Sequence, residues 1–198
     1  MKSIILYTSK YGSTEECAKI LYSYLVHNAK IINLQSQEIP DLSNYDNVIL
    51  GTPIYMGKFS KEIIHFIDIH QDILQKKSFD LFLVSSERNT EYIKNNMPDN
   101  LQDIVKSSVF LGSALDLEKL SFIKRIVMKY CLKTESYNNI DYDKIKGFAK
   151  TINQRAFIND NWEIPKIFVF PLRKVERITS AKLFDKIRET DLIFQTNA

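Results

Sequence analysis

The chain has 198 residues, of which 44% are hydrophobic and 26% charged, and its formal net charge at pH 7 is +3. These values are typical of one globular domain with room for an appendage, and they exclude a low-complexity chain, a strongly acidic protein and any need for a nucleic-acid partner. No apolar run approaches the ~20 residues that cross a bilayer and no secretion signal stands at the start, so we expect a cytoplasmic protein.

Short apolar runs alternate with helical patterns along most of the chain. The pattern predicts strands at residues 4–7, 30–34, 47–51, 79–85 and 109–114, and helices at residues 14–27, 60–70, 99–106 and 142–153. Strands that alternate with helices form a parallel sheet through right-handed crossovers. We therefore expect a three-layer, doubly wound α/β domain over residues 1–155, with ligands bound beyond the carboxyl ends of its strands.

The first predicted strand runs directly into a loop rich in hydroxyl groups. This loop leads into a helix N-terminus, where free N–H groups and partial positive charge bind anions. Its single glycine fits neither the triphosphate-binding nor the dinucleotide-binding spacing. The candidates for holding one terminal phosphate are Thr8, Ser9, Lys10, Tyr11, Gly12, Ser13 and Thr14. The alternative is an ordinary turn with a capping hydroxyl.

Two more loops leave the same edge of the predicted sheet. The loop after the third strand has a rigid proline, an aromatic centre and a glycine, which suit a flat conjugated ring. The loop after the fourth strand can form hydrogen bonds with the edge of a heterocycle. The candidates are Thr52, Pro53, Ile54, Tyr55, Met56 and Gly57 in the first of these loops, and Ser85, Ser86, Glu87, Arg88 and Asn89 in the second. Internal packing is the alternative for Tyr55 and Met56, and a solvated surface position is the alternative for Arg88.

Two motifs at the ends of predicted strands resemble those of the flavodoxin family. They are Thr-Ser-Lys-Tyr-Gly-Ser-Thr, after the first strand, and Val-Ile-Leu-Gly-Thr-Pro-Ile-Tyr-Met-Gly-Lys-Phe, which includes the end of the third. Residues 111–116 and a basic, apolar insertion at residues 115–137 are similar to the branch that contains menaquinone-dependent protoporphyrinogen dehydrogenase. The resemblance implies a flavodoxin-like, five-stranded fold that binds FMN, with the phosphate in the first loop and the isoalloxazine between the other two. The cofactor would carry the redox chemistry, so we expect no catalytic acid or base, and no metal.

Two segments lie outside a minimal five-stranded unit. In the insertion at residues 115–137, basic side chains are interleaved with apolar ones, which suits either a membrane-surface or quinone-access element or an amphipathic helix packed on its own domain. The tail at residues 156–198 is rich in aromatic and β-branched residues, so we expect it to be structured. We favour an extension packed on the domain over a lid that brings Trp162 or Phe168 to the ring.

Two functions are compatible with an FMN site. The first is an oxidoreductase that takes electrons from a lipophilic donor, such as protoporphyrinogen, and passes them to a quinone or another acceptor. The alternative is an electron-transfer carrier without its own substrate, against which the net charge of +3 weighs because carriers of this family are usually strongly acidic. For the two cysteines, Cys17 and Cys131, we expect free thiols, with Cys17 buried rather than reactive.

Overall fold

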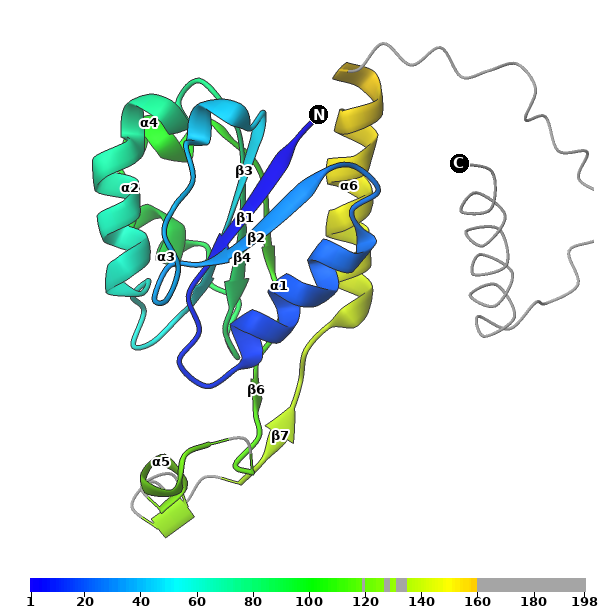
Figure 1. Cartoon of the computed structure of the whole chain (residues 1–198). Helices are drawn as coiled ribbons and strands as arrows, with labels where there is room; N and C mark the ends of the chain where they lie inside the picture. Colours follow the sequence, from blue (N-terminus) through cyan, green and yellow to red (C-terminus); the bar gives the residue numbers. More distant parts are fainter. Residues whose placement is uncertain (119, 127–128, 131–134, 160–198) are drawn as a thin grey trace, which may run out of the picture. The chain divides into compact units, whose positions relative to one another are not determined.

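A computed structural model of the chain describes residues 1–118, 120–126, 129–130 and 135–159 (Figure 1). Our predictions for Cys131, for Trp162 and Phe168, and for the packing of the extension fall outside the described residues.

Five parallel strands form the central sheet, in the order β2-β1-β3-β4-β5. Their bounds are β1 Ser3–Tyr7, β2 Ala29–Asn33, β3 Asn47–Pro53, β4 Ser78–Val84 and β5 Val105–Phe110. After β1 the chain forms β2 next to one edge of β1, and it then crosses back to form β3 next to the other edge. The loops after β1 and β3 therefore lead in opposite directions, which makes this place a topological switch point. This arrangement confirms the expected doubly wound α/β fold.

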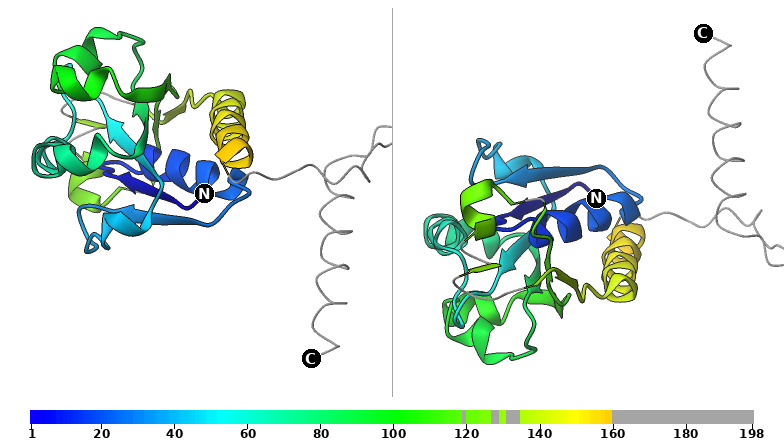
Figure 2. Two further views of the ribbon diagram at one scale, coloured as in Figure 1. Left: turned by 90° about the horizontal axis from the view of Figure 1, so that it is seen from above. Right: turned by 90° about the horizontal axis from the view of Figure 1, so that it is seen from below.

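Helices cover both faces of the sheet (Figures 1 and 2). Helices α1 (Ser13–Tyr24) and α6 (Tyr142–Asn159) pack together on one face, while α2 (Lys61–Leu74), with the short α3 (Glu91–Lys94) and α4 (Asp99–Gln102), lies on the other. A short 3-10 turn, η1 (Leu42–Asn44), precedes β3. Successive side chains of β1 point to opposite faces, so Ile4 and Leu6 join the core under α2 and Ile5 joins the core under α1 and α6.

A buried ion pair fixes α6 to the sheet. The Asp80 side chain in β4 is fully buried, and Arg155 Nη2 of α6 donates to its two carboxylate oxygens at 2.6 and 2.7 Å. Ser107 Oγ of β5 donates to Asp80 Oδ1 at 2.6 Å. The helix continues to Asn159, past the domain boundary predicted at residue 155.

The end of the sheet differs from the sequence-based prediction. Strand β5 occupies Val105–Phe110 instead of residues 109–114, and the helix predicted at 99–106 is only the four-residue α4. The reason is that β5 is an edge strand in which half-buried side chains alternate with the exposed Lys106 and Ser108. Its first half therefore lacks the apolar run by which the other strands were recognised.

The insertion begins and ends as a two-stranded antiparallel ribbon, β6 (Ala114–Leu115) with β7 (Tyr137–Asn138). Figure 1 shows this ribbon leaving the sheet at the carboxyl ends of the strands, with the short helix α5 (Phe122–Ile126) at its far end. Among the described helices, none combines the length and the hydropathy that a bilayer crossing needs.

Candidate cofactor-binding site

The loop after β1 is closed by one serine and one glycine. Gly12 has φ = 95° and immediately precedes α1, a left-handed conformation that favours glycine. Ser9 Oγ accepts hydrogen bonds from the backbone N–H groups of Gly12, at 3.1 Å, and Glu15, at 3.3 Å. The loop therefore curls over the start of α1, where helix geometry leaves the amides of Ser13 and Thr14 without partners inside the helix.

Thr14 supplies a further unsatisfied group at this place. Its side chain is 1% exposed, and its hydroxyl oxygen has no hydrogen-bond partner among the described residues. A buried polar atom without a partner is costly, whereas a bound anion would satisfy it together with the amides. The loop thus fits a phosphate group. Thr8 differs, because its buried hydroxyl is already hydrogen-bonded to Ser60 Oγ at 2.7 Å.

The loop after β3 is a tight hairpin. Tyr55 and Lys58 exchange two backbone hydrogen bonds of 3.0 Å, and the two residues between them, Met56 (φ = 51°) and Gly57 (φ = 75°), both have positive φ. Asn96 holds the turn from outside by donating to the Gly57 carbonyl at 2.9 Å. The Met56 side chain is fully exposed at the tip.

The loop after β4 forms several internal contacts. Ser85 is buried and its hydroxyl accepts from Glu87 N at 3.2 Å, while the Glu87 carboxylate accepts from the Tyr92 hydroxyl at 2.7 Å. The Arg88 guanidinium lies 3.6 Å from the Asp141 carboxylate. Arg88 is thus an exposed residue that pairs with Asp141, immediately before α6.

Residues from all three loops meet around one cavity of about 320 Å³ at the carboxyl ends of the strands. Two of the lining residues come from the first loop, three from the second and two from the third: Tyr11, Ser13, Pro53, Ile54, Tyr55, Ser85 and Ser86. No charged side chain of the described residues lines it. Met56, Gly57 and Asn89 line a separate hollow beside α3. We call the 320 Å³ cavity the ring pocket, because its size and mainly apolar wall fit a flat heterocycle.

The other wall of the ring pocket consists of residues absent from our list of candidates. Ser113, Ala114, Leu115 and Tyr137 line it, all from the base of the β6–β7 ribbon. Gly112 is the one feature of the sequence that could have indicated this wall. Its φ is 77°, and a Cβ there would lie 2.0 Å from the Asn139 carbonyl oxygen, so a glycine is needed where the ribbon leaves the sheet.

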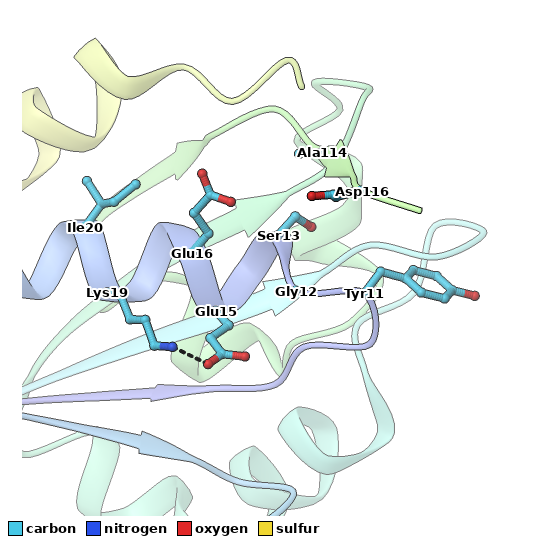
Figure 3. A pocket seen from close by; sticks show the side chains of 9 residues that line it. All are labelled: Tyr11, Gly12, Ser13, Glu15, Glu16, Lys19, Ile20, Ala114 and Asp116. Atoms are coloured by element: carbon cyan, nitrogen blue, oxygen red, sulfur yellow. Dashed lines mark hydrogen bonds and ion pairs between the residues drawn. The ribbon is translucent and has the colours of Figure 1, made fainter. Parts of the chain in front are cut away.

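A second cavity, of about 440 Å³, adjoins the ring pocket and shares Tyr11, Ser13 and Ala114 with it. Figure 3 shows its wall along α1, from which Glu15, Glu16 and Lys19 project. Glu15 forms an ion pair with Lys19, and the Glu16 carboxylate accepts from the Tyr142 hydroxyl at 2.9 Å. These carboxylates are therefore held by neighbouring side chains.

Burial raises the pKa of two side chains in this part of the domain, Tyr55 in the ring pocket and Cys17 in α1. Desolvation by burial raises the pKa of the Tyr55 phenol, with smaller contributions from Tyr11 and Tyr137. Burial likewise raises the pKa of the Cys17 thiol to about 12, and this residue is fully buried, as predicted. Among the described residues, no cluster of His, Cys, Asp or Glu could hold a metal ion.

Comparisons with known proteins agree with this geometry. A family model described as a flavodoxin domain matches residues 4–141. The chain is 33% identical over 111 residues to an uncharacterised protein of Methanocaldococcus jannaschii, covering 56% of this chain and 69% of that one. It is 24% identical over 172 residues to a protoporphyrinogen IX dehydrogenase (quinone) of Escherichia coli, covering 77% and 94%. The structure of oxidised flavodoxin 1 from Bacillus cereus superimposes with a TM-score of 0.51 at 16% identity, covering 78% and 98%.

The family match extends over more than half of the chain, from the first strand to the start of the last helix. The matched region contains the five parallel strands, the hydroxyl loop and the residues that line the uncharged ring pocket. The chain belongs to the flavodoxin family, and its cofactor is FMN.

Proposed function

We propose that the protein is an FMN-dependent oxidoreductase that transfers two electrons from a lipophilic donor, such as protoporphyrinogen, to a quinone. The observation that carries the proposal is the second wall of the ring pocket, which Ala114, Leu115 and Tyr137 of the insertion provide. A carrier needs only an exposed ring edge, whereas an added apolar wall beside the ring offers a lipophilic substrate a surface on which to bind. The Escherichia coli relative, whose name states this reaction, is matched over 94% of its length.

In this proposal the predicted site residues divide into three groups. Ser13 and Thr14 hold the phosphate through their amides and hydroxyls, Ser9 adds the hydrogen of its hydroxyl, and Gly12 closes the loop around them. The ring pocket takes the isoalloxazine. The residues that form contacts within the protein keep the loops in place: Thr8, Thr52, Gly57, Glu87, Arg88 and Asn89.

FMN, when bound, accepts a pair of electrons from one molecule and returns it to another. The residues of the chain then bind the cofactor, orient its ring and exclude water from the site. Pro53, Ile54 and Leu115 exclude water from the pocket, and the protonated Tyr55 phenol can donate a hydrogen bond but not act as a base. In each turnover the donor loses two electrons and two protons, and the quinone gains the same, so no further reactant is needed.

We further propose that the insertion brings the site to an anionic membrane surface, where a quinone is available. The side chains of Phe122 and Ile123 on α5 are 74% and 75% exposed, and Tyr130, seven residues further along the chain, is also exposed. Basic side chains, Arg125 and Lys129, are interleaved with these apolar ones. Apolar groups that enter the interface next to cations that meet anionic headgroups are the usual combination for such contacts.

An anaerobic assay with protoporphyrinogen and a menaquinone analogue tests the activity. We expect catalytic turnover in proportion to bound FMN. In the variant Leu115→Lys, which places a charge in the pocket wall, we expect turnover per bound FMN to fall strongly. A wild-type protein that holds FMN and exchanges electrons with artificial donors, yet turns over neither substrate, would instead be a carrier.

Sedimentation with vesicles tests the membrane contact. The double variant Phe122→Ser with Ile123→Ser should lose binding to vesicles that contain phosphatidylglycerol. Ile69→Ser is the matched control, because Ile69 is 61% exposed on α2, away from the insertion. Equal binding by all three proteins, or equal binding to neutral vesicles, would contradict the contact.

A further inference from the structure

Lys10 occupies a place that its position in the hydroxyl loop does not suggest. The sequence groups it with the phosphate ligands, but its Nζ lies 5.1 Å from the centre of the Tyr11 ring and 5.4 Å from that of Tyr55. The two rings are themselves in edge-to-face contact, with centres 5.9 Å apart and planes at 87°. Aromatic faces attract an ammonium group, so two rings from two loops hold this charge in place.

Both of these tyrosines line the ring pocket. The charge of Lys10 is therefore fixed at the rim of the cavity that receives the isoalloxazine, although Lys10 itself is exposed and does not line it. No carboxylate of the described residues forms an ion pair with Lys10, whereas Lys19 is paired with Glu15 and Arg88 with Asp141. Lys10 is thus a cation at the rim of the pocket that no carboxylate of the described residues pairs with.

We propose that Lys10 stabilises the reduced state of bound FMN and raises its reduction potential. The inference rests on the proposed placement of the ring. Two electrons and one proton leave the isoalloxazine one unit more negative than before, and a nearby positive charge favours that state over the oxidised one. No charged side chain of the described residues lines the pocket, so solvent and salt are the main screen between this charge and the ring.

A role in phosphate binding makes a different prediction, since the phosphate has the same charge in both redox states. A residue that binds the phosphate strengthens the binding of oxidised and reduced FMN equally. It does not affect the binding of riboflavin, which lacks the phosphate. A cation at the ring strengthens the reduced form selectively, for both FMN and riboflavin. Measuring both flavins in both redox states therefore separates the two roles.

The test uses Lys10→Gln in the full chain, with affinities of oxidised FMN and riboflavin from fluorescence titration and midpoint potentials from titration with dithionite. We expect reduced FMN to lose about ten-fold more affinity than oxidised FMN, which lowers the two-electron midpoint potential by about 30 mV. Lys10→Arg should retain the wild-type potential. Lys58→Gln, which removes an exposed charge from the hairpin that carries Tyr55, should shift the potential less.

An unchanged potential in Lys10→Gln would overturn the inference. If FMN affinity also falls while riboflavin affinity stays constant, Lys10 is a phosphate ligand. If the wild-type protein binds neither flavin, the proposed placement of the cofactor is wrong. That outcome is distinguishable from a failure of the Lys10 inference, because it is seen in the wild type before any variant is measured.

Discussion

Substituting alanine for Gly112 should detach the ribbon from the sheet. The left-handed conformation at φ = 77° costs a residue with a Cβ about 1–2 kcal/mol. The new Cβ would lie 2.0 Å from the Asn139 carbonyl oxygen, so this backbone must move. Two hydrogen bonds flank the contact, Asn139 N to Ser113 O and Asp141 N to Leu111 O, both 2.9 Å, and each contributes about 1 kcal/mol. The total is about 3–4 kcal/mol.

Thermal unfolding and FMN titration measure this effect. At about 2–4 °C per kcal/mol for a chain of this size, the Tm of Gly112→Ala should fall by about 10 °C, and FMN affinity should fall with it because one wall of the ring pocket moves. Gly147→Ala is the control, since nothing lies within 4 Å of its Cβ in the middle of α6. This change should raise stability by about 0.5–1 kcal/mol. Equal stability of Gly112→Ala and wild type would refute the reasoning.

Three further predictions concern buried groups. Arg155→Met should lower the free energy of unfolding in urea by about 3–5 kcal/mol, because it leaves the Asp80 carboxylate buried and unpaired; adding Asp80→Leu should restore most of it, and additive losses would argue against the pair. Thr14→Val should keep or raise stability while weakening FMN binding about ten-fold, as expected when a buried hydroxyl serves only the ligand; calorimetry and FMN titration would expose a structural role if both fall. In a Cys131→Ser background, Cys17 should react with a thiol reagent at pH 8 only on unfolding, and rapid native labelling would contradict its burial. Because its pKa is raised to about 12 in the folded state, its contribution to stability is present below the pKa of the unfolded thiol, about 8.5, and is lost as the pH rises toward 12.

The sequence predicted the architecture because the central strands are buried on both faces. Residues 4–7 and 48–51 are continuous apolar runs, and the structure places them on β1 and β3, inside the sheet. Strand β5 was misplaced because an edge strand contacts the core with alternate residues only, so polar residues interrupt its pattern. The other edge strand, β2, was located to within one residue because it keeps the apolar pair Ile31 and Ile32, whereas the first half of β5 holds Lys106, Ser107 and Ser108.

The three loops of the site were also predictable, since the carboxyl ends of parallel strands lie at one edge. Which side chains enter the pocket was not. Lys10 and Tyr11 are adjacent in the sequence, yet only Tyr11 lines the cavity while Lys10 rests on its ring. Leu115 and Tyr137 lie on two-residue strands, which are too short for any periodic signal, and they meet across 21 intervening residues.

The ribbon has a consequence for how this protein can change. The groups assigned to the phosphate belong to the loop after β1 and to the start of α1, whereas Ala114, Leu115 and Tyr137 belong to an appendage joined to the domain through Gly112 and Asn139. The groups assigned to the phosphate and one wall of the ring pocket therefore lie in separately replaceable parts. Exchanging residues 113–138 between relatives would transplant one wall of the cavity as a unit and leave the strands, their register and the hydroxyl loop as they are.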